Sequence, residues 1–532
     1  MLNAVLSVAL YSLVYRSVLV TASLDSQITL NTAHDPERAQ LLPEWAQAPS
    51  PDTTGQLIFN SISSLLIRWP NTMWKNGHTI APGRIPLGTM LYHGTYMSNG
   101  TAPTTSDWLG FDPEVGYLYC GNPCRVASYV ATRDLKVLYF DGFSAAKVPN
   151  SSYFETQDLL SWGSIRHDRI RWEPERLKAL CDWGREFSID GFVRMQWEFE
   201  VMYCNFAEGL DLVELSDLAP QFQALVGNGQ PPRPVGWKGD LMKGTHAYVE
   251  AFLAGQRHDR LPGEARVRID FHQVISFYDP ALSSLVDARR GKSRAYHSLE
   301  GISRDDTSTK LQELRVVLTR EERGTGIDWP ALFQGVYDRY VDRLQMLNDT
   351  LASADATMEH MKNARQLLLA LLVHHMAPTD LPSPGQSNNS WVSPVIERCS
   401  RSPAIHVKDA FFTPQERLIR NAVEDTLHEI CRRLGLMWVE ALDIESSEVA
   451  QRRAIALRWR THIGELLRWL DWPQFNRCVP GCAIGEMCYI SMVPYPWPED
   501  APDNITPRCI SQNYEQWPIY DPVQLERSDM LL

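Results

Sequence analysis

The sequence predicts an α+β protein, in which a strand-rich first part precedes a mostly helical region and a cysteine-rich tail. In residues 56–227, short apolar segments such as GTMLYHGT and FEVMYCNF are bounded by Gly, Asp or Asn, as strands are. PERLKALCDWGREFS in the same range repeats apolar residues at helical spacing. Residues 306–376 and 410–470 read as mostly helical, and CVPGCAIGEMC opens a tail too rich in Gly and Pro for a packed core.

The first 22 residues predict a signal peptide or a signal anchor. Ala4 to Val14 form an apolar run of signal-peptide length, and Val20-Thr21-Ala22 supply the small residues that a signal peptidase accepts. Arg16 interrupts the segment, so a buried helix also stays open. No later segment reaches the ~18 apolar residues needed to cross a bilayer. Residues 23–55, which are polar and dotted with proline, read as a linker.

Cysteine usage and glycosylation motifs favour a secreted or extracellular protein, with membrane anchoring by the N-terminal segment as the alternative. The ten cysteines include the pair Cys120 and Cys124 and a cluster in residues 471–532. Disulfides are the simplest staple for such a tail, and they require an oxidising compartment. A zinc site is the competing interpretation. Glycosylation sequons occur at five positions: Asn99, Asn150, Asn348, Asn388 and Asn504.

Composition breaks divide the rest of the chain. NGQPPRPVGWKGD, from Asn228 to Asp240, ends the first domain (56–227). A mixed strand and loop segment (238–305), a helical block (306–376) and a linker (377–409) follow. The second helical block (410–470) opens with Thr413-Pro414-Gln415-Glu416, a capping box with proline at the first helical position. The disulfide-stapled tail (471–532) ends the chain. The net charge of −13 has no basic stripe, which argues against nucleic acid as a partner.

Three motifs in the first domain could carry chemistry. LYHGT places His93, Gly94 and Thr95 at the end of a strand. DWLGFDPEVGYLYC runs from a strand with Trp108 into a proline-started helical turn that presents Tyr117 and Tyr119. MQWEFEVMYC is a strand with Glu198 and Glu200 on one side.

In their order and wording, these motifs resemble the ADP-ribosyltransferase superfamily in its histidine–aromatic–glutamate branch. The resemblance covers about residues 80–215 and implies a split β-sheet domain that takes NAD as substrate. The overall layout also resembles a set of fungal secreted proteins that lack an assigned activity. The resemblance implies ADP-ribosyl transfer to an unknown protein or small-molecule acceptor, or NAD glycohydrolysis.

The resemblance also implies a role for each residue. His93 would position the ribose, and the backbone at Gly94 and Thr95 would hold the nicotinamide carboxamide. Trp108 and Tyr117 would stack on the nicotinamide ring, with Tyr119 as the alternative second aromatic residue. Glu200 would stabilise the positive charge that develops at the anomeric carbon when the bond to nicotinamide breaks. No metal is expected.

A second hypothesis assigns no catalysis to this fold. The chain would then be a catalytically inactive extracellular or cell-surface interaction protein, because a fold can persist without its active site. The two hypotheses differ in whether His93, Trp108 and Glu200 point into one cleft.

Overall fold

The computed structural model confirms the α+β class. It describes residues 45–95, 103–120, 124–148, 151–195, 198–218, 251, 253–321, 324–352, 357–380, 382, 389–401, 404, 407–490 and 506–511. The predicted signal segment and all sequons except Asn348 lie outside these residues. Among the described helices, none combines the length and the apolar character that a bilayer crossing needs.

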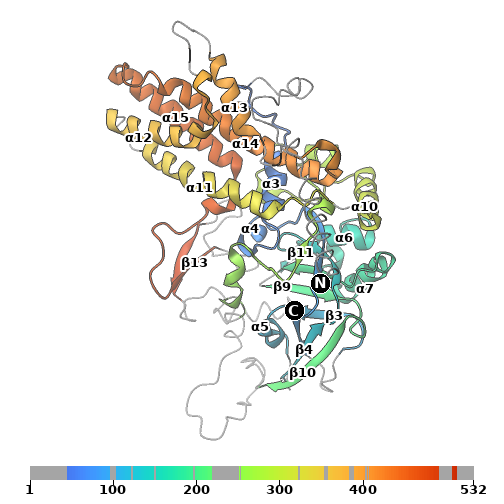
Figure 1. Ribbon diagram of the computed structural model, residues 1–532. Helices are drawn as coiled ribbons and strands as arrows, with labels where there is room; N and C mark the ends of the chain where they lie inside the picture. The colour runs from blue at the N-terminus through green and yellow to red at the C-terminus, as the bar shows by residue number, and fades with distance from the viewer. Residues whose placement is uncertain are drawn as a thin grey trace, which may run out of the picture.

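One mixed, curled sheet of ten strands forms the first layer (Figure 1). Its strands are β1 (Thr79–Ile85), β2 (Met90–Thr95), β3 (Asp107–Gly110), β4 (Cys124–Ala131), β5 (Leu135–Phe140), β8 (Gly191–Met195), β9 (Phe199–Tyr203), β10 (Leu210–Leu218), β11 (Arg268–Ile269) and β12 (Ile275–Ser276). The order is β10-β4-β2-β3-β9-β8-β5-β1-β11, and β12 also pairs with β1. Only the pairing of β5 with β8 is parallel among those described. The segment predicted as separate, 238–305, therefore contributes two short strands to the same sheet.

Helices cover both faces of this sheet. They are α3 (Gly55–Ser63), α4 (Arg68–Thr72), α5 (Pro113–Leu118), α6 (Glu155–Trp162), α7 (Glu173–Gly184), α9 (Ser283–Arg289), α10 (Arg304–Thr319), α11 (Trp329–Ala352), α12 (Met358–Leu372), α13 (Ser393–Ser400), α14 (Pro414–Ala441) and α15 (Val449–Leu470). The predicted capping box at Thr413 and Glu416 is present at the start of α14. Helices α11 to α15 gather at one end of the molecule, with α3 between them and the sheet (Figure 1).

Two hydrophobic clusters fix the two faces of the sheet. The first joins Leu91, Leu109 and Val201 of the strands to the helical region, including the buried indoles of Trp329 and Trp459. The second joins the opposite sheet face, including Met202, to the helices α6, α7, α9 and α10. The helical region and the sheet thus share one continuous core, because the first cluster runs through both.

Five disulfides pair all ten cysteines. They are Cys120–Cys124, Cys181–Cys204, Cys399–Cys431, Cys478–Cys488 and Cys482–Cys509. The last two cross-link the tail around a small two-stranded sheet, β13 (Glu486–Tyr489) with β14 (Arg508–Ser511). The predicted stapling of the tail is therefore confirmed.

Candidate functional site

The three predicted motifs lie on neighbouring strands. β2, with LYHGT, pairs with β3, with DWLGF, and β3 pairs with β9, with the EFE sequence. Tyr92 lies opposite Gly110, and Gly110 lies opposite Glu200. Segments more than a hundred residues apart in the sequence therefore meet in one row across the sheet.

Register divides the predicted residues between the two faces. Trp108 lies opposite Met202 and two positions from Gly110, so it shares a sheet face with Glu200. His93 lies opposite Ala127, between the first cluster's Leu91 and Leu109. Successive side chains alternate between faces, so His93 points to the other side of the sheet from Trp108 and Glu200. The structure does not bring these three side chains into one cleft.

His93 has a local partner instead of an open site. Its Nδ1 lies 2.8 Å from the backbone carbonyl of Trp108, and because a carbonyl only accepts, Nδ1 carries the hydrogen. Its ring also meets Phe206 edge-to-face, with the ring centroids 5.8 Å apart. The imidazole is buried and ties β2 to β3.

Gly94 allows helix α5 to lie directly on β2. A Cβ built at Gly94 would stand 2.0 Å from the carbonyl oxygen of Gly116 and 2.7 Å from the backbone nitrogen of Cys120. Both neighbours are backbone atoms, so neither can move aside cheaply. α5 and the residue after it carry Tyr117 and Tyr119, which pack against Leu118. Thr95 is buried at the end of β2. Close packing between elements accounts for the glycine.

Glu200 lies at one end of a buried network of alternating acidic and basic side chains. Arg194 lies directly opposite it and donates from Nε to its carboxylate at 2.6 Å. Arg194 also donates to both carboxylate oxygens of Glu173, at 3.1 and 3.2 Å. Arg176 then joins Glu173 to Asp158, at 3.0 and 3.1 Å.

We call these side chains the Glu200 network, and their positive and negative charges are equal in number. Its carboxylates are Glu200, Glu173 and Asp158, and its cations are Arg194, Arg176 and Lys147, the last 3.2 Å from Glu173. Burial opposes ionisation of Glu173, but Arg194, Lys147 and Arg176 lower its pKa to about 2. Burial likewise opposes the charge of Arg194, yet Glu173 and Glu200 raise its pKa. The negative charge of Glu200 is thus already paired with Arg194 within the protein.

A second buried cluster lies where β3 and β9 meet the segment after residue 250. Asp112 precedes α5, Glu198 precedes β9, and His258 lies in a short 3₁₀ turn, η4 (Gly255–Asp259). The Nε2 atom of His258 lies 3.3 Å from Glu264, 3.6 Å from Asp112 and 3.9 Å from Glu198, in each case to a carboxylate oxygen. Its Nδ1 lies 3.0 Å from the carbonyl of Gly263 and carries a hydrogen toward it.

Arginines already occupy the carboxylates of this cluster. Arg68 lies 3.3 Å from Glu198, Arg266 lies 2.9 Å from Asp112, and Arg257 also contacts Asp112. The Asp112, Glu198 and His258 atoms are close enough together to share a cation. However, three guanidinium groups beside them would repel a divalent ion, so the donor set does not fit a metal.

Two groups of the cluster, Glu198 and His258, hold a proton tightly. Burial opposes the ionisation of Asp112, but hydrogen bonds from His258 and Arg266 lower its pKa. Burial raises the pKa of Glu198 to about 8, although Arg68 and His258 oppose the shift. Burial opposes the charge of His258, but Asp112, Glu264 and Glu198 raise its pKa. A Cβ at Gly255 would stand 1.1 Å from Glu198 Oε1, so the 3₁₀ turn seals this carboxylate directly.

The sequence interpretation named Glu198 but gave no role to Asp112, and it missed the residues that pair with both. Arg68 is the one charged residue in the apolar run SSLLIRWP, and this pattern could have indicated a buried ion pair. Nothing around His258 distinguishes it from a surface histidine in the sequence GQRHDR.

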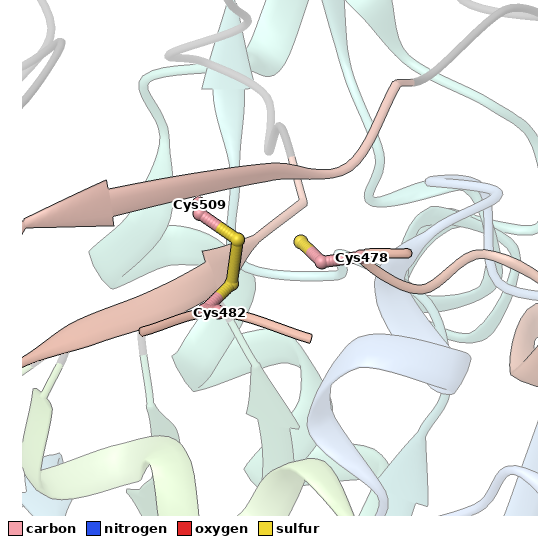
Figure 2. A group of neighbouring side chains, drawn as sticks. All are labelled: Cys478, Cys482 and Cys509. Carbon is pink, nitrogen blue, oxygen red and sulfur yellow. A yellow bond between two sulfur atoms is a disulfide. The ribbon is translucent and has the colours of Figure 1, made fainter. Parts of the chain in front are cut away.

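Cysteines of the tail form the second group with metal-ligand geometry. Figure 2 shows Cys482 bonded to Cys509, with Cys478 beside them. Cys478 is bonded to Cys488. Because all three sulfurs are in disulfides, they offer no thiolates, and the zinc interpretation of the tail is not supported.

Comparison with known proteins places the chain near two yeast proteins. The model of the YPL277C N-terminal domain family matches residues 121–231, a range that includes Glu200 but not LYHGT. The uncharacterized protein YPL277C of Saccharomyces cerevisiae is 25% identical over 439 residues, covering 65% of this chain and 84% of that protein. No solved structure matches. The uncharacterized protein YOR389W of the same yeast is 27% identical over 532 residues, covering 81% of this chain and 80% of that protein, so this chain is similar to it along most of both lengths.

Proposed function

We propose that this chain is an exported, catalytically inactive interaction protein. One observation carries the proposal: Glu200, the carboxylate that the family resemblance makes catalytic, is the buried end of the Glu200 network. A carboxylate stabilises a transition state only if it points at the positive charge that develops there. Glu200 is instead aimed at Arg194, at 2.6 Å.

The other motif residues support the same proposal. His93 lies on the opposite sheet face and bonds the backbone of Trp108. Gly94 is covered by α5. Each residue that would bind NAD therefore already has a partner or a packing role within the domain.

Pairing of all ten cysteines supports the export part of the proposal. Structural disulfides persist in secreted proteins and are rare in reducing compartments. Two of the five cross-link the tail.

The test is the release of nicotinamide from NAD by the purified secreted protein, measured by chromatography. We expect no release above the rate without protein, and the same result for Glu200→Gln and for the control Glu175→Gln, an exposed carboxylate on α7. Release by the wild type that falls at least about a hundredfold in Glu200→Gln alone, the size expected for a lost electrostatic contact, would overturn the proposal.

A second candidate function is NAD cleavage, by ADP-ribosyl transfer or hydrolysis. The observation that favours it is the adjacency of β2, β3 and β9, which places Tyr92, Gly110 and Glu200 in one row. In this candidate Trp108 and Tyr117 or Tyr119 stack on nicotinamide, and Arg194 must turn from Glu200 when NAD binds. The same assay separates the two candidates.

A further inference from the structure

In the part of the chain that the structure describes, strand β10 is an open edge of the ten-stranded sheet. It runs for nine residues, pairs with β4 on one side, and has no described strand on the other. Figure 1 shows it at the end of the sheet far from α11 to α15. Four of its apolar side chains are exposed: Leu212 (48%), Val213 (59%), Leu215 (41%) and Leu218 (41%). An edge with free backbone groups and exposed apolar side chains is a template for one more strand.

The two faces of β10 differ in chemistry. Leu212 lies opposite Tyr129, and Leu215 lies opposite Ala127, so both leucines share the face of the first hydrophobic cluster. Asp211 and Glu214 lie opposite Val130 and Ser128, on the other face. The face of Leu212 and Leu215 is therefore mainly apolar, with Asp217 near its end. The other face carries Asp211 and Glu214, with Leu218 at its end.

The acidic face is not neutralised within the described chain. Asp217, on the face of the two leucines, pairs with Arg125 at 2.6 Å. On the other face, Asp211 and Glu214 have no ion-pair partner among the described residues, although Glu214 accepts a hydrogen bond from Ser216. The strand LDLVELSDL contains no Lys or Arg. Side chains directly opposite each other on adjacent strands interact, and opposite charges are favourable there.

We propose that β10 binds an extended partner segment in which basic and apolar residues alternate. Such a segment would add an eleventh strand, with its basic side chains beside Asp211 and Glu214 and its apolar side chains beside Leu212 and Leu215. Main-chain hydrogen bonds supply affinity in this mode of recognition, and the alternate side chains supply specificity. This inference rests on the proposed interaction function and names the partner's chemistry.

A second copy of this chain does not fit the edge. Two-fold antiparallel pairing of β10 with itself keeps each face on its own side, so the register that aligns the full length of both strands sets Glu214 of one copy opposite Glu214 of the other. Like charges directly opposite are destabilising. The register also shifts between Leu212 and Glu214, a bulge of the kind that protects edges from copies of themselves.

The experiment measures binding of ten-residue peptides to the full secreted protein at low ionic strength, by fluorescence anisotropy. The probes are alternating Lys-Val, alternating Glu-Val, and a block peptide of five Lys followed by five Val. We expect Lys-Val to bind more tightly than either other peptide, and more weakly as salt is added. Equal binding of the alternating and block peptides would show charge attraction alone and overturn the proposal.

A charge reversal tests the position of the site. In Asp211→Lys/Glu214→Lys we expect Lys-Val binding to weaken at least about fivefold and Glu-Val binding to strengthen, because two cross-strand pairs change sign. The control Glu175→Lys/Glu321→Lys makes the same change in net charge at exposed positions away from β10, and it should retain the preference for Lys-Val. Equal effects of the two double variants would overturn the proposal.

Self-association is checked on the same protein by analytical ultracentrifugation. We expect a monomer, and a dimer that Leu212→Lys dissolves would assign the edge to a second copy instead. A failed peptide experiment leaves the nicotinamide assay unaffected, so the failure of this inference is distinguishable from failure of the proposed function.

Discussion

The Glu200 network, which is anchored on strands β8 and β9, and the edge strand β10 of the same sheet differ in whether their charged side chains are paired within the chain. In the network, three carboxylates face three cations, and all of them except the half-buried Lys147 are buried. On β10, Asp211 and Glu214 have no ion-pair partner among the described residues and are exposed to solvent, as are the neighbouring leucines. Buried charges are tolerated only when paired, whereas a surface can leave charge and apolar area for a partner. We propose on this basis that the strands with the motifs stabilise the fold, and that the edge strand β10 is the surface for binding.

The largest expected effect comes from breaking the network at its centre. Arg194→Met leaves Glu200 and Glu173 without their shared cation, and removing one partner of a buried pair costs about 3–5 kcal/mol. We expect the free energy of unfolding in urea to fall by this amount. The control Arg185→Met removes an exposed pair with Asp182 and should cost about 0–1 kcal/mol. Similar losses in the two variants would mean that the network is not structural.

A smaller effect is expected where α5 meets β2. Gly94→Ala forces a methyl group against backbone atoms of α5, and overpacking of this kind costs about 1–3 kcal/mol. Gly335→Ala in α11 meets no atom within 4 Å and should be neutral or stabilising by up to about 1 kcal/mol, since alanine favours helix. Thermal unfolding measures both. A Gly94→Ala variant as stable as the wild type would show that this glycine serves something other than packing.

The buried cluster around His258 predicts a dependence on pH. The folded-state pKa values of Glu198 (about 8) and of His258 are both raised above their unfolded values. At pH values between the unfolded and the folded pKa of each group, the folded protein therefore binds more protons than the unfolded chain. Stability from these groups is therefore complete below the unfolded pKa of each group, and it is lost as pH rises through the folded pKa.

Chemical denaturation at pH 5.5 and pH 8.0 checks this sign. We expect the wild type to lose at least about 1 kcal/mol more than Glu198→Gln across this interval, the value of roughly one pKa unit, because glutamine does not titrate. Parallel pH curves for the two proteins would contradict the raised pKa of Glu198.

The smallest effect is expected on β10 itself. Leu215→Ala should change the free energy of unfolding by no more than about 0.5 kcal/mol when no partner is present, because the side chain is exposed. Leu91→Ala, on the same sheet face but buried, should cost about 2–5 kcal/mol. A large loss in Leu215→Ala would mean that the edge is already covered within the folded chain.

Local pattern predicted the elements well. The capping box at Thr413, the helix around Leu177 and the strand around Glu200 all lie where spacing and turn residues placed them. The clustered cysteines of the tail also predicted that it is linked by disulfides, but not which cysteines pair. The helix and strand features depend on neighbours within a few residues, which is the range over which a sequence can be read directly.

The site was harder to predict because its geometry is long-range. Alternation along β2 separates His93 from Tyr92, but only pairing with β3 and β9 shows which of them shares a face with Glu200. Arg68 and Glu198 are 130 residues apart, and no local pattern links them. Glu198 could therefore be recognised by its motif, whereas its pairing with Arg68 could not be predicted.

The most direct test of the comparison is hydrogen exchange of the full chain, measured by mass spectrometry. It is carried out under three conditions: with NAD, with the Lys-Val peptide, and with neither. The account predicts slow exchange in β9 under all three conditions, and rapid exchange in β10 that slows only when the peptide is added. Slower exchange in β2 and β9 on adding NAD, with β10 unchanged by the peptide, would contradict it.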